Sequence, residues 1–396
     1  MPSKRCSRPV RCSSPVEPSR LAAMTPADDR PYSPGLEGVV AGETSIALVD
    51  GANGRLLYRG YPIGELVRDG TYAQVAELLW TGAWPDHAEL HPAALPEAVV
   101  STLRALPPTA HPMDALRSAV SVWGAESGAK WPPSADQARA LTALTPSALA
   151  AFARLRRGDE VIPPDPQLDL ATGFLYQLNG ERPEPAAARA LDAYFITAAE
   201  HSFNASTFTA RVITSTRSDM ASAVAGAIGA LKGPLHGGAP GEVVNQLLEI
   251  GSVDRAEQWA RDTIARGERI MGFGHRVYRA YDPRAAALRD VARGMSGMAD
   301  WLETAVAVED VVLRVLAEMK PDRVIKTNVE FYAAAVLQGV GLPPDLFAAT
   351  FAMARHAGWT AHVLEQAGAN RLIRPDVRYV GPAERSLPKV ATAARG

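Results

Sequence analysis

Helical periodicity after residue 33 is the feature that most limits what this chain can fold into. Apolar residues recur at spacings of three and four along two clear runs, which end before Pro321 and Gly267. The runs contain Val308, Val311, Val312, Val315, Leu316 and Met319, and Ala256, Trp259, Ala260, Thr263 and Ile264. Patterns of strand and helix do not alternate, which argues against a doubly wound sheet. We therefore expect an all-α fold.

Residues 44–60 are the exception to this helical pattern. Two short apolar stretches, 45–49 and 55–58, flank a turn sequence that is rich in Asp, Asn and Gly. These turn residues favour a tight connection between antiparallel strands. The segment predicts a short N-terminal β-hairpin.

Composition sets the broad class of the protein. The chain has 396 residues, of which 47% are hydrophobic and 21% charged, so it can bury a large core. Its net charge of -2 gives no electrostatic reason to expect nucleic acid or a membrane surface as a partner. Both cysteines, Cys6 and Cys12, precede the globular region, so we expect neither a disulfide framework nor a cysteine metal site there. We expect a soluble protein in a reducing compartment.

Residues 1–33 differ from the rest of the chain. Up to Ala23 the segment has five basic residues, one acid, five serines and four prolines, so it cannot form a core and is expected to be disordered. An organelle transit peptide is one explanation, although the prolines would break its amphipathic helix. A dispensable tail, or a start codon placed upstream of the true start at Met24, explains the segment better.

Three short segments combine a proton-carrying side chain with glycines or apolar neighbours. They are residues 233–238, 272–277 and 328–332, and they contain His236, His275 and Glu330 respectively. Two imidazoles and a carboxylate can remove a proton from carbon while supplying protons to oxygen. No strand pattern precedes the glycines at 272 and 274, so a nucleotide-binding fingerprint is not expected. The three segments predict carbon acid chemistry.

A helix expected between Pro344 and Glu365 has an unusual polar face. That face contains Phe351, Arg355, Gly358, His362 and Glu365. On pattern alone, either the face is a partly exposed stripe in which Arg355 pairs with Glu365, or Arg355 points into a polar cavity and binds a carboxylate. A second set, His201, Asn204 and Phe208, is also spaced to share a helix face.

Together these motifs resemble the citrate synthase family, from about Gly35 to Pro382. The similarity includes residues 60–66 and 371–375, and the motifs occur in the family's order. The resemblance implies a large domain of residues 34–239 and 346–396, a small domain of residues 240–345, and a tail of residues 1–33. It also implies an active site in the cleft between the domains, closure by a hinge movement, and a homodimer.

The resemblance further implies roles for individual residues. His236 would hydrogen-bond the thioester carbonyl of acetyl-CoA, His275 would act as an acid at the ketone of oxaloacetate, and Glu330 would remove the methyl proton. The contacts to oxaloacetate or citrate would come from His201, Arg284, Arg355 and Arg374, with Arg374 reaching across the dimer interface. The loop that receives CoA would contain Ile270, Met271, Gly272, Phe273 and Gly274.

The implied reaction joins acetyl-CoA, oxaloacetate and water into citrate and CoA, at the entry to the tricarboxylic acid cycle. Acetyl-CoA is a substrate, so no cofactor and no metal are expected. The bacterial cytoplasm is the expected location, without nucleic acid or membrane partners. The paralogue 2-methylcitrate synthase, which uses propionyl-CoA, stays open because one methylene is worth only about 1–3 kcal/mol in a pocket.

Glu330 departs from the Asp that most family members have. An extra methylene displaces the carboxylate by about 1 Å unless the backbone compensates, as we expect here, and such a misplacement costs about a hundredfold in rate. A catalytically impaired paralogue with a binding or regulatory role is therefore an alternative. A hydrolytic metal site formed by His201, His236, His275 and Glu330 is disfavoured, because the sequence has no paired ligand spacing.

Overall fold

The computed structural model describes residues 32–237, 239–274, 278, 280–294 and 299–387. Two compact units share the chain: one is Thr44–Ile373, and the other joins Met1–Glu43 to Arg374–Gly396. Each is described by itself. In the described part of the second unit, the one regular element is a 3-10 helix, η1, at Pro34–Leu36.

The unit Thr44–Ile373 starts with a small antiparallel sheet. Strands β1 (Ala47–Asp50) and β2 (Arg55–Tyr58) form the predicted hairpin, and a two-residue strand, β3 (Tyr61–Pro62), adds to β2. The Asp50 carboxylate accepts hydrogen bonds from the Asn53 side-chain amide, from Arg55 and from the Asn53 backbone N–H, which lower the pKa of Asp50 to about 2. Gly54, at φ +62°, supplies the left-handed residue that closes the turn.

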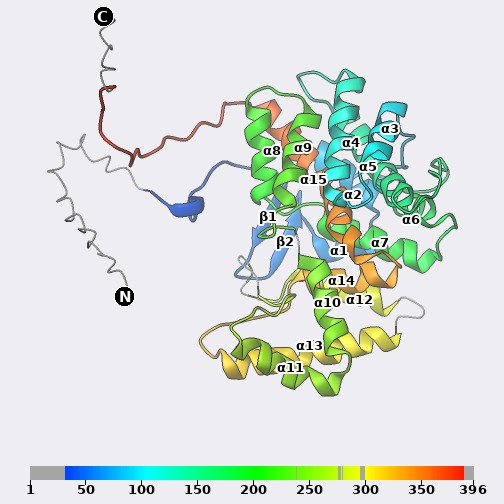
Figure 1. Cartoon of the computed structure of the whole chain (residues 1–396), viewed down its shortest axis with the longest axis vertical. Coiled ribbons are helices and arrows are strands. Elements are labelled where there is room, and N and C mark those ends of the chain that lie inside the picture. The colour runs from blue at the N-terminus through cyan, green and yellow to red at the C-terminus, as the bar shows by residue number, and fades with distance from the viewer. Residues whose placement is uncertain (1–31, 238, 275–277, 279, 295–298, 388–396) are drawn as a thin grey trace, which may run out of the picture. The chain divides into compact units, whose positions relative to one another are not determined.

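Helices form the rest of the unit, and the all-α prediction is confirmed (Figure 1). The first half contains α1 (Ile63–Asp69), α2 (Tyr72–Thr81), α3 (Glu97–Ala105), α4 (Pro112–Ser127), α5 (Ala135–Leu155), α6 (Leu170–Asn179) and α7 (Pro185–Ala198). The second half contains α8 (Ala205–Ser215), α9 (Met220–Leu231), α10 (Ala239–Ile250), α11 (Val253–Ala265), α12 (Pro283–Arg293), α13 (Ala299–Met319), α14 (Val329–Gly339), the 3-10 helix η2 (Pro344–Leu346) and α15 (Phe347–Gly368).

Helix α15 runs through the main hydrophobic core. It contacts α2, α5, α7, α8 and α9, and its residues from Ala352 to Val363 are all buried. The small side chains Ala354, Ala357 and Ala361 let these neighbours approach closely. Because α15 is enclosed in this way, any charge on it must find a partner inside the protein or bind a ligand.

A second, smaller hydrophobic cluster joins α11 and α13, which lie side by side (Figure 1). Its members include Ala256, Ala260, Val308, Val312 and Val315, which are residues of the two apolar runs seen in the sequence. The two long helices therefore bury their apolar faces against each other. Among the residues that the structure describes, no helix is long and apolar enough to cross a membrane.

Candidate active site

Three helices of equal length begin with an Asn or Asp cap and carry a polar residue at the second helical position. Asn204 caps α8, Asp282 caps α12 and Asn328 caps α14, and each side chain accepts a hydrogen bond from a backbone N–H of the first turn. The residues at the second position are Ser206, Arg284 and Glu330. The positive ends of these three helix dipoles favour negative groups nearby.

Asp282 joins two of these helix starts. Its buried carboxylate accepts hydrogen bonds from Nε and Nη2 of Arg284, at 3.1 and 2.8 Å. It also accepts one from the backbone N–H of Val329, at 3.1 Å. Burial lowers the pKa of Arg284, but the Asp282 charge outweighs burial and raises it overall. The same carboxylate therefore fixes the guanidinium of Arg284 and the start of α14, where Glu330 lies.

Glu330 is a half-buried carboxylate near two cations. Desolvation raises its pKa to about 7, against the opposing charges of Arg284 and Arg355. Its charge also acts on the buried Tyr194 of α7, as do the charges of both arginines. A carboxylate with a pKa near 7 matches the requirement of a general base at neutral pH.

Arg355, from the middle of α15, is almost completely buried. Its Nε donates to the carbonyl oxygen of Ala198 at the end of α7, and its guanidinium carbon lies 4.7 Å from the ring centroid of Phe351. Burial lowers the pKa of Arg355, and the negative charge of Glu200 opposes this effect. Because Arg355 is buried, the face is not a partly exposed stripe; that Arg355 points into a polar cavity and binds a carboxylate stays a prediction. Glu365 pairs instead with Arg211, at 2.7 Å.

His236 packs against the start of α8. Its Nε2 lies 3.3 Å from the backbone nitrogen of Ser206 and 2.8 Å from Ser206 Oγ. Because a backbone N–H can only donate, this contact assigns Nε2 as the acceptor and places the ring proton on Nδ1. Burial, together with the charge of Arg355, lowers the pKa of His236 to about 4, so the imidazole is neutral at pH 7.

His201 lies in the connection between α7 and α8. Its Nε2 is 3.3 Å from the hydroxyl of Tyr278, and the two rings meet edge to face. The prediction that His201, Asn204 and Phe208 share a helix face was wrong, because α8 begins only at Ala205. The spacing misled because Asn204 caps the helix from outside it.

The segment Ile270–Gly274 is fastened to the residues that precede α14. Gly274 N–H donates to the carbonyl of Lys326 at 2.7 Å, and the Asn328 N–H donates to the carbonyl of Gly272 at 2.9 Å. The Asn328 side chain also donates to the Gly274 carbonyl at 2.8 Å. A Cβ on Gly272 would lie only 3.1 Å from Phe331, so the glycine is needed for this close approach.

Electrostatic interactions link four of the predicted site residues: His236, Arg284, Glu330 and Arg355. The charge of Arg355 acts on both His236 and Glu330, and the charge of Arg284 acts on Glu330. His201 joins them through Tyr278, whose ring faces Arg284 at 5.8 Å. His275 lies outside the described residues. Arg374 belongs to the other compact unit, so its position relative to these residues is not defined.

Sequence reasoning missed three residues that support this site. They are Asp282, Ser206 and Trp359, whose Nε1 donates to Ser206 Oγ at 3.1 Å. Asp282 carried a signal, because Asp followed by Pro and Arg is typical of a capped helix start. Ser206 and Trp359 carried none, since only the packing of α8 on α15 brings them together.

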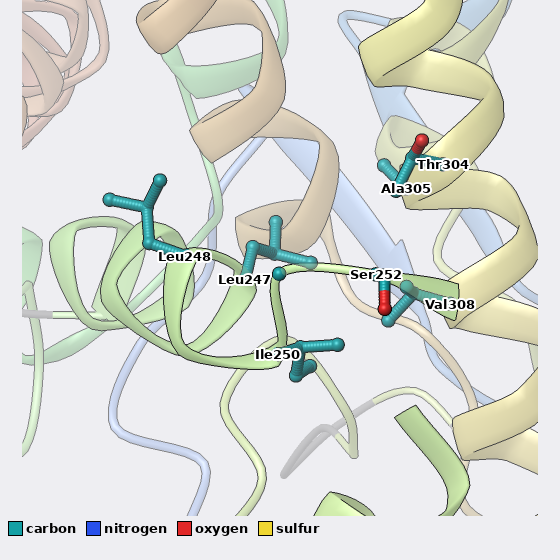
Figure 2. A pocket seen from close by; sticks show the side chains of 8 residues that line it. Leu247, Leu248, Ile250, Ser252, Thr304, Ala305 and Val308 are labelled. Atoms are coloured by element: carbon teal, nitrogen blue, oxygen red, sulfur yellow. The ribbon is translucent and has the colours of Figure 1, made fainter. Parts of the chain in front are cut away.

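The cavity in Figure 2 is not this site. It has a volume of about 400 Å³ and lies between α10, the turn at Gly251–Ser252 and α13. Leu247, Ile250 and Val308 line it, and no charged side chain does. Among the described residues, no group of three or more His, Cys, Asp and Glu side chains is arranged to hold a metal ion.

Comparison with protein families and curated proteins gives consistent matches. A family model described as citrate synthase, C-terminal domain, matches residues 35–376. The chain is 41% identical over 367 residues to a citrate synthase of Haloferax volcanii, covering 88% of this chain and 95% of that protein. It is 40% identical over 394 residues to a 2-methylcitrate synthase of Mycobacterium tuberculosis, covering 96% and 98% of the two chains.

A solved structure is similar over nearly the whole chain. It is a ternary complex of carboxymethyl coenzyme A and oxaloacetate with a citrate synthase from Thermoplasma acidophilum. The TM-score is 0.80 at 30% sequence identity, and the alignment covers 92% of this chain and all of that one.

Proposed function

We propose that this chain, which belongs to the citrate synthase family, condenses acetyl-CoA with oxaloacetate and water to give citrate and CoA. The protein is an enzyme of the acyltransferase type that this family represents. One observation carries the proposal: Glu330, a carboxylate whose pKa burial raises to about 7, interacts electrostatically with two buried arginines, Arg284 and Arg355. This arrangement pairs a base for a carbon acid with cations for a dicarboxylate.

Proton removal from the acetyl group would use Glu330 and His236. The ionised carboxylate of Glu330 takes a methyl proton, and the developing negative charge on the thioester oxygen needs a hydrogen-bond donor. The neutral His236, with its proton on Nδ1, is such a donor. A neutral imidazole is closer in acidity to an enol than an imidazolium would be, so it stabilises the enolate without giving up its proton early.

Oxaloacetate would be held by Arg284, Arg355 and His201, with Arg374 contributed by the second subunit of a homodimer. The Nε atoms of Arg284 and Arg355 are engaged by Asp282 and by the Ala198 carbonyl, so both guanidinium groups are oriented before a ligand arrives. Preorganised forks of this kind bind carboxylates well. His275 would supply a proton to the ketone oxygen as the new carbon–carbon bond forms.

The CoA thioester would enter along Ile270–Gly274. The hydrogen bonds from this segment to Lys326 and Asn328 support the proposal, because they bring the loop next to the start of the helix that holds Glu330. Residues 240–345 would form the small domain that closes over the substrates. The separate hydrophobic cluster of α11 and α13 gives this segment a packing centre of its own, which supports the proposal. No cofactor and no metal take part in the proposed reaction.

Activity is tested by following CoA thiol release from acetyl-CoA in the presence and absence of oxaloacetate. We expect release that depends on oxaloacetate, with citrate as the product identified by mass spectrometry. Titration calorimetry of oxaloacetate alone measures binding separately from chemistry. A protein that binds oxaloacetate but releases no CoA from either acyl donor would support the binding or regulatory alternative.

The 2-methylcitrate synthase reaction is the second candidate, because the relative of that name matches 96% of this chain at 40% identity. Its donor, propionyl-CoA, differs by one methylene, which changes affinity by only about 1–3 kcal/mol. Parallel measurement of kcat/KM with acetyl-CoA and propionyl-CoA decides between the two. A preference above tenfold for propionyl-CoA would overturn our assignment of the donor.

A further inference from the structure

A second carboxylate, Glu200, is completely buried beside the candidate site. It follows the end of α7 and directly precedes His201. Its Oε1 lies 3.0 Å from Nε2 of His362 and also accepts the backbone N–H of Ser202. Among the described residues, none donates a hydrogen bond to its Oε2. A buried carboxylate oxygen without a donor is costly, so its position needs an explanation.

The hydrogen-bond partners of His362 fix its protonation. Nη1 of Arg211 lies 3.0 Å from His362 Nδ1, and a guanidinium can only donate. Nδ1 is therefore the acceptor, so Nε2 carries the proton and donates it to Glu200. Arg211 Nη1 also donates to Glu365 Oε2 at 2.7 Å, which anchors the far end of this chain of contacts.

Glu200 lies against the polar face of α15. A Cβ on Gly358 would come within 2.4 Å of Glu200 Oε2 and 2.3 Å of the Ala199 carbonyl oxygen, so the glycine makes room for this segment. One turn earlier on the same face, Arg355 donates through Nε to the carbonyl of Ala198. The negative charge of Glu200 also acts on Arg355. Residues 198–201 and the face of α15 thus contact each other at Arg355, Gly358 and His362.

We propose that Glu200 and His362 form a positioning pair, which holds residues 198–201 against α15 and thereby orients Arg355 and His201 for the ketodicarboxylate substrate. The two residues act through Arg355 and His201 and do not touch the substrate themselves. That the substrate is oxaloacetate rests on the proposed function, whereas the contact between residues 198–201 and α15 is independent of that function.

The sharpest test removes the donor on His362. His362→Phe keeps the ring but cannot donate to Glu200, and we expect it to weaken oxaloacetate binding at least tenfold in calorimetry while the KM for the acyl donor stays within twofold. His362→Gln can place an amide N–H near the position of Nε2, and we expect it to recover most of the lost affinity.

His356→Phe is the matched control. His356 is also completely buried on α15, but its Nδ1 binds only the Ala352 carbonyl of its own helix, at 2.6 Å, and no described residue contacts its Nε2 through a hydrogen bond. We expect this variant to bind oxaloacetate like the parent. Equal losses in His356→Phe and His362→Phe would mean a general disturbance of the core and would overturn the proposal, as would a folded His362→Phe with unchanged affinity.

Amide hydrogen exchange of a peptide spanning residues 196–204 provides a readout that needs no substrate. We expect faster exchange in His362→Phe than in the parent or in the His356→Phe control. If the parent fails to bind oxaloacetate, the proposed function fails, while the exchange rates still decide whether the pair holds this segment. Unchanged exchange in His362→Phe would overturn the proposal.

Discussion

At the scale of single residues, Glu330 combines two opposing effects. Burial raises the pKa of its carboxyl to about 7, while Arg284 and Arg355 favour the charged form. The result is a group that is partly ionised at neutral pH, as the proposed general base requires. Its position at the second residue of α14 follows from the Asn328 cap, which the sequence motif at 328–332 already contained.

Replacement of this base should separate chemistry from binding. We expect Glu330→Gln to lower kcat by about 10²–10⁴, the usual contribution of a positioned base, and to leave oxaloacetate affinity nearly unchanged. If the backbone is shifted to fit the longer side chain, as we expect, Glu330→Asp should also lose activity. Steady-state turnover and calorimetry check both variants. An Asp variant faster than the parent would show that no such compensation exists.

The pH dependence of the rate should report the same group. As the proposed base, Glu330 would act in its deprotonated form, so kcat/KM should fall about tenfold for each pH unit below about 7 and level off above it. Buffers of constant ionic strength between pH 5.5 and 8.5 give this profile. A rate that does not change between pH 5.5 and 7 would contradict the role of Glu330 as the base.

The contribution of Glu330 to the free energy of unfolding should fall as pH rises, whereas the rate should increase. Burial raises the pKa of Glu330 in the folded protein to about 7, compared with 4.5 for an unperturbed Glu side chain. Between these values the folded state binds more protons than the unfolded chain, so this group lowers stability as pH rises from 4.5 through 7. Glu330→Gln should therefore raise Tm relative to the parent more at pH 8 than at pH 5. The exposed Glu65→Gln on α1 controls for the loss of one carboxylate at the surface.

At the scale of elements, packing of α15 against the end of α7 depends on the absence of a side chain at Gly358. We expect Gly358→Ala to lower the free energy of unfolding by about 1–3 kcal/mol and to weaken oxaloacetate binding, because its Cβ would overlap the Ala199 carbonyl and Glu200. Gly64→Ala, where a Cβ meets nothing within 4 Å, should be neutral or stabilising. Chemical denaturation of both variants measures the difference.

Elements with strong local signals could be predicted from sequence. The two apolar runs lie within α11 and α13, and the hairpin matches β1 and β2. The short strand β3 and the position of Asn204 just before the start of α8 were missed, because two-residue strands and helix caps carry little periodicity. The partners of Glu200 and Asp282 depend on contacts across many residues of sequence, so no local pattern could reveal them.

At the scale of the whole molecule, we predict that each active site is shared between the two subunits of a homodimer. We expect Arg374→Ala to weaken oxaloacetate binding strongly, since a substrate carboxylate would lose a charged partner. Mixing Arg374→Ala subunits with His275→Ala subunits should restore activity, because a heterodimer would contain one site with both residues intact. Heterodimers that form but stay inactive would argue against Arg374 crossing the interface.

The N-terminal segment gives a second prediction at this scale. Residues 1–23 are polar and interrupted by prolines, and they precede the segment 35–376 that the family model matches. A protein that starts at Met24 should therefore keep its Tm and its activity unchanged. A clear loss of either property would show that the segment contributes to the folded structure.

The attachment of Ile270–Gly274 to residues 326–328 has a consequence for protein engineering. A chimaera that exchanges only residues 270–274 with a relative would have to preserve the hydrogen bonds to Lys326 and Asn328 and the close fit between Gly272 and Phe331. The two segments are therefore structurally coupled, although about fifty residues separate them in the chain. Attempts to change acyl preference by loop exchange should move both segments together.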